Sequence, residues 1–204
     1  MIAWGAGMRW SQSATAWLGF FAAMTDGRVM LRHELTFIGE SPEMVAPQIV
    51  AACAEWKIQV PIVLAQPEIF PAPDGHGETI SETFRRHGVP MRAADDDRIN
   101  GWSRVRSWLQ PRRHGDQLQP SLVIHDDCLY FRRIFPTLVQ DPKEPDDVLE
   151  TPDEYPATAL RFYLMSRPLP ATVDTKPEPG PGTWGHALKH HFQPARRVIG
   201  DYLR

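Results

Sequence analysis

Apolar residues along this chain occur in short runs with the period of either a strand or a helix. The apolar runs "IAWGA", "VPIVLAQPEIF", "VPMRAAD" and "SLVIHD" predict four strands, each bounded by Gly, Pro or polar residues. Residues 14–38 predict two further strands joined at Asp26 and Gly27, because Asp-Gly favours a tight hairpin turn. Most of the apolar residues between these runs follow helical spacing instead.

Helical spacing predicts five helices. In the first, Ser41 is a suitable N-cap and Pro42 suits the first turn. In the third, Ile99, Trp102, Val105 and Leu109 share one predicted face. The order strand, hairpin, helix, strand, helix, strand, helix predicts an α/β fold with a mixed β-sheet flanked by helices. The predicted helices cover residues 41–56, 78–88, 96–110, 128–140 and 156–166.

Composition changes after residue 168. Residues 1–168 predict one domain, residues 169–183 a Pro-rich linker, and residues 184–204 a basic tail that also carries apolar side chains. We expect this Pro-rich C-terminal tail to become ordered on a partner through residues 184–204, with its basic residues steering the encounter. The alternative is that its apolar side chains fold back onto the surface of the domain itself. His186 and His190 in the tail have no third metal ligand nearby in the sequence.

The formal net charge is −3, so the overall charge gives no indication that the protein binds nucleic acid or a membrane surface. No apolar run is long enough to span a membrane, and no leader pattern begins the chain. The two cysteines, Cys53 and Cys128, form no C-x-x-C pair, which favours a reducing cytoplasm over a zinc or redox motif.

Short catalytic motifs are absent: the sequence has no Walker A, G-x-G-x-x-G, G-x-S-x-G or H-E-x-x-H pattern. Longer strings carry more information. The chain contains "ADDDRINGWSRVRSWLQP", then "LVIHDDCLYFRRIFPTLVQDPKEPDDV", then "DEYPATALRFYLMSRP". Together with the opening "IAWGAGMRWSQSATAWLGFF" and with "VLAQPEIF", these resemble, in one consistent order, the C-terminal nuclease domain of the large terminase subunit of tailed bacteriophages.

This resemblance implies a ribonuclease H-like fold and a role in phage DNA packaging. Members of the family cut DNA with acidic side chains that hold two divalent ions at the edge of the sheet. One ion generates the attacking hydroxide and the other stabilises the leaving oxygen. The family's motor ATPase precedes the nuclease, so we expect the ATPase here to be a separate polypeptide or lost.

The resemblance places the family's acids on three neutral residues. The first falls on Ala3, where D-W-G or D-P-G is expected, the second on Gln66 in place of the Asp of A-D-P, and the third on Thr158 in place of the Asp of D-A-L-R. Alanine cannot bind a metal, and amide or hydroxyl oxygens are weak Mg²⁺ ligands. We therefore expect these three positions to meet in space as a catalytic site that has lost its charge.

A displaced metal site is the alternative. Glu68, Asp153 and Glu154 are the substitute acids, and Mg²⁺ or Mn²⁺ is expected only if they form a cage. Otherwise no cofactor is expected. Asp153 and Glu154 also suit a helix N-terminus, and Asp95, Asp96 and Asp97 suit caps of the helix that follows them.

A second set of candidate residues is basic. Arginines concentrated around one predicted helix either line a groove that follows DNA phosphates or form a solvated helix face. The tryptophans among them favour the core over a base-stacking role. The candidate nucleic-acid-binding residues are Arg98, Arg104, Arg106, Arg112 and Arg113.

The sequence thus predicts a terminase nuclease-like domain with impaired catalysis, a pseudo-nuclease that binds double-stranded DNA or packaging proteins in the cytoplasm of a bacterial host cell. Two alternatives stay open. One is a weak metal-dependent endonuclease that uses the displaced carboxylates. The other is a docking module for the terminase ATPase, portal or procapsid. Whether the chain is an enzyme stays open at this point, and no membrane partner is expected.

Overall fold

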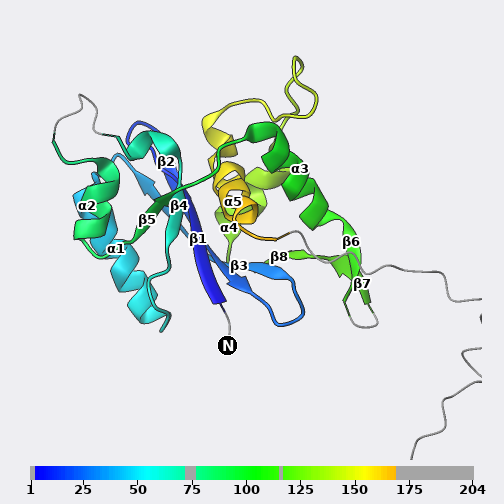
Figure 1. Ribbon diagram of the computed structural model, residues 1–204, viewed down its shortest axis with the longest axis horizontal. Coiled ribbons are helices and arrows are strands. Elements are labelled where there is room, and N and C mark those ends of the chain that lie inside the picture. Colours follow the sequence, from blue (N-terminus) through cyan, green and yellow to red (C-terminus); the bar gives the residue numbers. More distant parts are fainter. Residues whose placement is uncertain (1–2, 72–76, 115–116, 169–204) are drawn as a thin grey trace, which may run out of the picture. The chain divides into compact units, whose positions relative to one another are not determined.

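A computed structural model describes residues 3–71, 77–114 and 117–168 of the chain. Within these residues a six-stranded sheet has the order β5-β4-β1-β2-β3-β8, and a separate hairpin is formed by β6 and β7 (Figure 1). The predicted α/β class with a mixed sheet is confirmed. The strands are β1 Ala3–Arg9, β2 Thr15–Ala23, β3 Val29–Ile38, β4 Val63–Ala65, β5 Met91–Ala93, β6 Pro111–His114, β7 Gln117–Pro120 and β8 Leu122–Ile124.

The first three strands are an antiparallel meander, and the others join its two sides in parallel. β4 pairs in parallel with β1, β5 with β4, and β8 with β3. The predicted hairpin is present, and its turn closes with a hydrogen bond from Met24 N to Arg28 O of 2.8 Å. Gly27 adopts a φ of 85°, a left-handed conformation that glycine reaches without steric cost.

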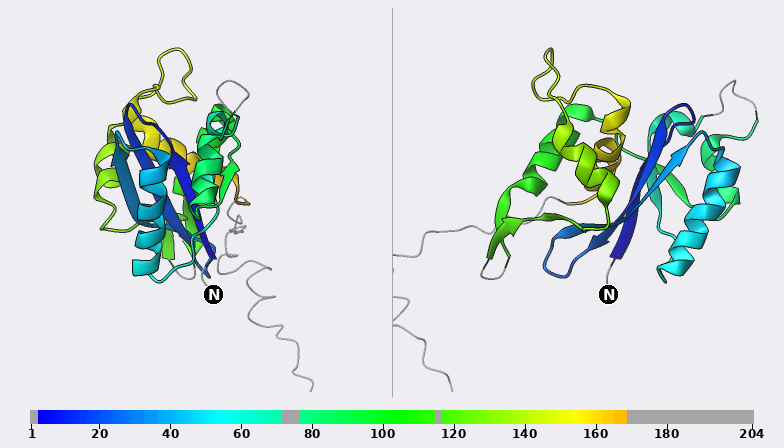
Figure 2. Two further views of the ribbon diagram at one scale, coloured as in Figure 1. Left: turned by 90° about the vertical axis from the view of Figure 1, so that its left-hand side faces the viewer. Right: turned by 180° about the vertical axis from the view of Figure 1, so that it is seen from behind.

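Helices cover both faces of the sheet (Figure 2). One hydrophobic cluster joins α1 and α2 to one face, and includes Met8, Ile49 and Phe84. A second cluster joins α3, α4 and α5 to the other face, and includes Phe21 and Leu160. The helices are α1 Pro42–Glu55, α2 Ile80–Arg86, α3 Arg98–Leu109, α4 Leu129–Ile134 and α5 Tyr155–Met165, with short 3-10 turns at Pro67–Ile69, Phe135–Thr137 and Pro152–Glu154.

Glycine in β1 lets α5 approach the sheet closely. A Cβ at Gly7 would lie 2.1 Å from the Ala159 carbonyl oxygen, a distance that no side chain tolerates. Side chains alternate along a strand, so Gly5, Gly7 and Arg9 share the face of β1 that α5 covers, while Ala6 and Met8 face α1. The backbone of α5 thus runs directly against β1, and this contact fixes which residues of the two elements meet.

The sequence pattern missed several local features. The predicted strand at 60–70 shortens to β4 because Pro67 has no N–H for the ladder, and a 3-10 turn follows. The buried face of α3 differs from the predicted one. Trp102, Val105 and Trp108 are buried, whereas Ile99 is 42% exposed and Leu109 is 38% exposed. The β6–β7 hairpin was not anticipated. Ser41 holds the N-cap position, but its side chain makes no cap hydrogen bond.

The predicted linker (169–183) and tail (184–204) lie outside the described residues, as do His186 and His190. Both stay predictions. In the part of the chain that the structure describes, no helix is long and apolar enough to cross a membrane.

Candidate functional site at the carboxyl edge of the sheet

Two parallel strands end side by side and bring Arg9 and Gln66 together. The last register pair of β1 and β4 is Met8 with Ala65, so the next residue of each strand lies at the same edge. Gln66 is 3% exposed. Its Oε1 accepts a hydrogen bond from Trp10 N at 2.9 Å, and its Nε2 donates to Trp10 O at 2.7 Å. The Gln66 amide therefore continues the strand pairing, and both of its polar atoms are engaged within the protein.

The Arg9 side chain places a positive charge at this edge. Its guanidinium lies 5.2 Å from the centre of the Tyr155 ring, at the start of α5. Its Nη1 is 3.8 Å from Glu68 Oε2, a long pair with an exposed carboxylate. Stacking on an aromatic ring and a nearby carboxylate both favour the charged guanidinium in this position. The cation therefore stands beside Gln66, where two parallel strands and a helix N-terminus converge.

Thr158 is buried one helical turn beyond Tyr155, and its hydroxyl donates to Glu154 Oε1 at 3.0 Å. Glu154 is itself buried and accepts from Arg98 Nη1 at 2.8 Å and Nη2 at 3.0 Å. The carboxylate of Glu154 is thus compensated by a fork of donors from one arginine.

Arg98 ties together three segments that are distant in sequence. Beyond Glu154 it donates to both oxygens of Asp147, at 2.7 and 2.9 Å, and to the Val148 carbonyl at 2.8 Å. Burial opposes ionisation of Asp147, but Arg98 and the Val148 N–H outweigh it and hold the pKa of Asp147 below its usual value. The first turn of α3, the loop before the last helix and the N-terminus of α5 are joined through this one side chain.

The structure contradicts the predicted position of the first acid. Ala3 begins β1 and pairs with Ala23, five residues before Met8. At about 3.3 Å per residue this separates Ala3 from the carboxyl edge by roughly 17 Å. The prediction that Ala3, Gln66 and Thr158 meet is therefore wrong for Ala3. The β1 residue beside Gln66 is Arg9. Sequence matching missed it because the alignment relied on the short "AWG" match, which contains no information on strand register.

Gln66, which follows β4, and Thr158, which belongs to α5, lie against the same part of the sheet. Gly7 is the register partner of Leu64, two residues before Gln66, and approaches the carbonyl of Ala159, the residue after Thr158. The strand register and the close approach of Gly7 to α5 are therefore consistent with the prediction that Gln66 and Thr158 lie near each other.

The substitute acids do not gather. Glu68 is 67% exposed and faces Arg9, Asp153 is exposed, and Glu154 is held by Arg98 and Thr158. Across residues 3–71, 77–114 and 117–168, no three His, Cys, Asp or Glu side chains are close enough to hold a metal ion. The described residues thus do not fit the pair of divalent ions that the resemblance implies.

The candidate arginines separate into different environments. Arg98 is 27% exposed and directs its donors toward Glu154, Asp147 and Val148, so it has a packing role, and its DNA contact stays a prediction. Arg104 donates to the Arg167 carbonyl at 3.1 Å, and Arg106 pairs with Asp146 at 3.4 Å. Arg112 donates to the Ser107 carbonyl at 3.3 Å, and Arg113 is exposed on β6. For Arg104, Arg106, Arg112 and Arg113, DNA binding stays a prediction.

A residue that the sequence analysis passed over, Arg161, is fully buried in α5. Its Nη2 donates to Asp96, and its guanidinium carbon lies 5.0 Å from the Phe162 ring centre and 6.0 Å from that of Trp102. Asp97 caps α3 by accepting from Asn100 N at 3.0 Å, as predicted. The string "ADDDRINGW" and the arginine of "ALRF" are therefore two halves of one packing contact between α3 and α5.

This fold, with α5 laid across the first strand of a six-stranded mixed sheet, is similar to that of solved large terminase nuclease domains, in line with the predicted ribonuclease H-like fold. The P22 large terminase nuclease domain has a TM-score of 0.61 and 14% identity, with 82% of each chain covered. The large terminase of a thermophilic bacteriophage has a TM-score of 0.58 and 13% identity; the match covers 80% of this chain and 39% of that one. The predicted fold is confirmed.

Sequence comparisons do not extend this result. No protein-family model matches the chain, and no curated protein matches it. The likeness to these two terminase structures therefore concerns the fold, and function must be argued from the residues at the site.

Proposed function

We propose that this protein is a terminase nuclease-like domain that acts in phage DNA packaging without cutting DNA, in the cytoplasm of the bacterial host. One observation carries the proposal: the edge where β1 and β4 end presents Arg9 beside Gln66. A guanidinium repels a divalent cation, and a glutamine whose amide is used by the backbone offers it no ligand.

The chemistry of phosphodiester hydrolysis supports this reading. Two-metal cleavage needs anionic oxygens that hold the ions roughly 3.5–4 Å apart. At this edge, Glu154 is neutralised by Arg98, and Glu68 is exposed and turned toward Arg9. A fixed cation can still attract a phosphate, but it cannot generate a hydroxide in the way a bound metal does. The edge is thus suited to contact DNA phosphates or a packaging protein.

A plasmid-nicking assay tests the proposal. The protein at micromolar concentration is incubated with supercoiled DNA and either Mg²⁺ or Mn²⁺. We expect no metal-dependent nicking above a buffer control. Nicking that is lost in Glu68→Ala or in Asp153→Ala, and retained in Arg86→Ala at an exposed position of α2, would overturn the proposal and establish the displaced-carboxylate nuclease instead.

DNA binding is measured separately, since a domain that does not cut can still bind. A labelled duplex titrated at fixed salt gives an affinity for wild type and for Arg9→Gln. The loss of one contact between an arginine and a DNA phosphate weakens binding several-fold. We therefore expect Arg9→Gln to bind DNA about three- to tenfold more weakly than wild type. Unchanged affinity would indicate that the edge serves a protein partner, as in the docking-module alternative for the ATPase, portal or procapsid.

A further inference from the structure

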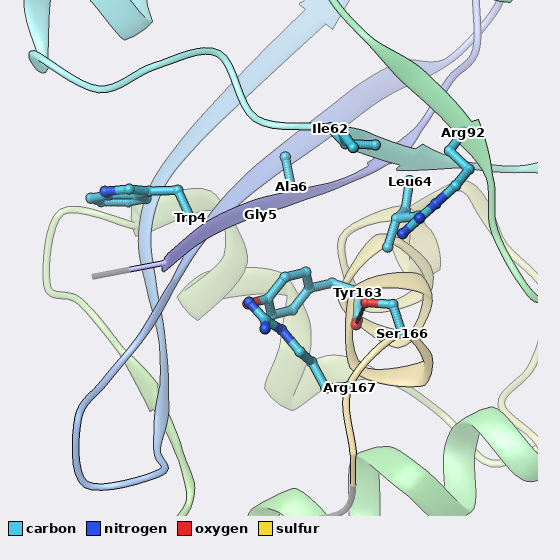
Figure 3. Close-up of a pocket in the computed structure, with 9 residues that line it drawn as sticks. All are labelled: Trp4, Gly5, Ala6, Ile62, Leu64, Arg92, Tyr163, Ser166 and Arg167. Carbon is cyan, nitrogen blue, oxygen red and sulfur yellow. Dashed lines mark hydrogen bonds between the residues drawn. The ribbon is translucent and has the colours of Figure 1, made fainter. Parts of the chain in front are cut away.

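A pocket of about 230 Å³ lies on the α5 face of the sheet, away from the carboxyl edge (Figure 3). Its floor is formed by the early residues of β1 and β4, including Gly5 and Leu64, and one wall by the end of α5. Gly5 carries no side chain because the Tyr163 ring occupies that space: a Cβ would lie 2.5 Å from Tyr163 Cε2. The site is about four β1 residues, or roughly 13 Å, from Arg9.

Two arginines on different elements provide the charge of the pocket. Figure 3 shows Arg92 extending from β5 to lie beside Leu64, and Arg167 lying against the Tyr163 hydroxyl from beyond α5. The two arginines thus line the pocket from separate segments of the chain, and Arg167 contacts the Tyr163 ring. Among the described residues, no Asp or Glu lines the pocket to balance the charge of the two arginines.

One of the two guanidinium groups is fixed in place. Arg167 donates to the Tyr163 hydroxyl from Nε at 2.9 Å and from Nη2 at 2.6 Å, and its guanidinium carbon lies 5.0 Å from that ring centre. These contacts use the Nε and Nη2 donors of the Arg167 guanidinium and leave its Nη1 group to donate to another acceptor. Arg92 is exposed, and among the described residues it forms no ion pair.

The end of α5 would by itself disfavour an anion, because helix C-termini carry a partial negative charge. Arginines offset that charge here. Arg104 reaches across from α3 and donates to the Arg167 carbonyl at 3.1 Å, which caps one of the free carbonyls beyond the helix. Arg104 and Arg167 therefore place positive charge at this end of α5, and Arg92 lines the same pocket from β5.

We propose that this pocket binds a phosphate group, held between Arg92 and Arg167. Planar guanidinium forks match the oxygens of phosphate, and the two arginines offer donors from separate elements. The volume is below the 300–1,000 Å³ typical of pockets for drug-sized ligands, so it suits a phosphate with an adjoining sugar and not a larger molecule. Ile62, 51% exposed at the rim, provides an apolar surface for that sugar.

The phosphate could come from a DNA backbone or from a small phosphate ester, and the two sources are separated by two probes. Inorganic phosphate is titrated into the full-length protein by calorimetry, and a short fluorescein-labelled DNA duplex is titrated by anisotropy at fixed salt. The test variant is Arg92→Gln. The matched control is Arg86→Gln, which removes the same charge from a side chain that is 57% exposed on α2, against the other face of the sheet.

We expect Arg92→Gln to weaken binding of at least one probe by about tenfold, the loss typical of one charge-assisted contact, while Arg86→Gln leaves it within about twofold. An effect on the duplex alone assigns the site to a DNA backbone, and an effect on inorganic phosphate alone assigns it to a small phosphate ester. Ile62→Glu, which places an acid at the exposed rim, is expected to reproduce the loss with the arginines intact.

Two results would overturn the proposal. One is that neither probe binds the wild-type protein. The other is that Arg92→Gln and Arg86→Gln weaken duplex binding equally, which would show a general charge effect. Circular dichroism and a thermal melt of each variant confirm that it is folded. The proposal does not depend on the absence of DNA cleavage, so a positive nicking assay would overturn the proposed function and leave this site intact.

Discussion

Gly101 of α3 leaves the space that the Arg161 side chain of α5 fills. A Cβ at Gly101 would lie 2.5 Å from both Cγ and Cδ of Arg161. Arg161 is fully buried, and in the described residues its Nε and Nη1 have no hydrogen-bond partner. Asp96 and the faces of Trp102 and Phe162 offset part of that cost. The contact explains why a glycine stands in the middle of a helix, where it is otherwise unfavourable.

Gly101→Ala is therefore expected to destabilise the protein. Alanine improves helix propensity by about 1 kcal/mol. The added methyl group displaces the stem of a buried arginine, which costs about 1–3 kcal/mol. We expect a net loss of about 1 kcal/mol in the free energy of unfolding, measured by urea denaturation. Ser103→Ala, at an exposed position of the same helix, is the control. A more stable Gly101→Ala variant would show that Arg161 has room to move.

Arg98→Gln tests the clamp that joins α3 to the N-terminus of α5. The substitution leaves the buried Glu154 without its cationic partner, and removing one member of a buried pair costs about 3–5 kcal/mol. Because Arg98 is 27% exposed, we expect the lower end, about 3 kcal/mol, from chemical denaturation. Arg106→Gln breaks only the exposed pair with Asp146 and should change stability by less than about 0.5 kcal/mol. Equal effects of the two substitutions would contradict the clamp.

His33 predicts a pH dependence of stability. It stacks on Trp56 with ring centres 4.0 Å apart, and burial, followed by the charge of Arg32, lowers its pKa to about 4. In the unfolded chain a histidine binds its proton near pH 6.5. Between these values the unfolded state binds more protons, so stability falls as the pH falls from about 6.5 to about 4.

His33→Phe keeps a ring against Trp56 and removes the titrating group. We expect the free energy of unfolding of this variant to fall less than that of the wild type across the same pH range. An NMR titration of wild type should place the His33 midpoint near pH 4. Parallel stability curves for the two proteins would show that other groups govern the acid response.

The register of β1 and β4 predicts where a metal site can be rebuilt. Neighbouring strands lie about 4.8 Å apart, so acids at positions 9 and 66 would face one ion together. We expect Arg9→Asp with Gln66→Glu to bind Mn²⁺ roughly tenfold more tightly than wild type in a calorimetric titration. Ala3→Asp with Gln66→Glu places the two acids at opposite edges of the sheet, at the start of β1 and after the end of β4, and is expected to gain nothing. Equal gains in the two double variants would contradict the register.

Sequence reasoning located most elements because their signals are local. The Asp26-Gly27 turn, the Asp97 cap and the apolar runs depend on near neighbours. The first acid position was misplaced because a three-residue match carries no information on strand register. The ion pairs of Arg98 could not be predicted because nothing in its own segment indicates Asp147 and Glu154, which are 49 and 56 residues away.

By itself the sequence determined the fold class, which follows from patterns read along the chain, while the loss of acids at positions 66 and 158 stays what the resemblance implies. Only the tertiary structure decided which residues are neighbours at the carboxyl edge. It placed Arg9 beside Gln66, paired Arg98 with two distant carboxylates, buried Arg161, and left Arg92 and Arg167 around an open pocket. The physical reason is that charge acts through space: an arginine is a phosphate ligand or a packing residue according to which carboxylates the folded backbone brings within about 4 Å of it.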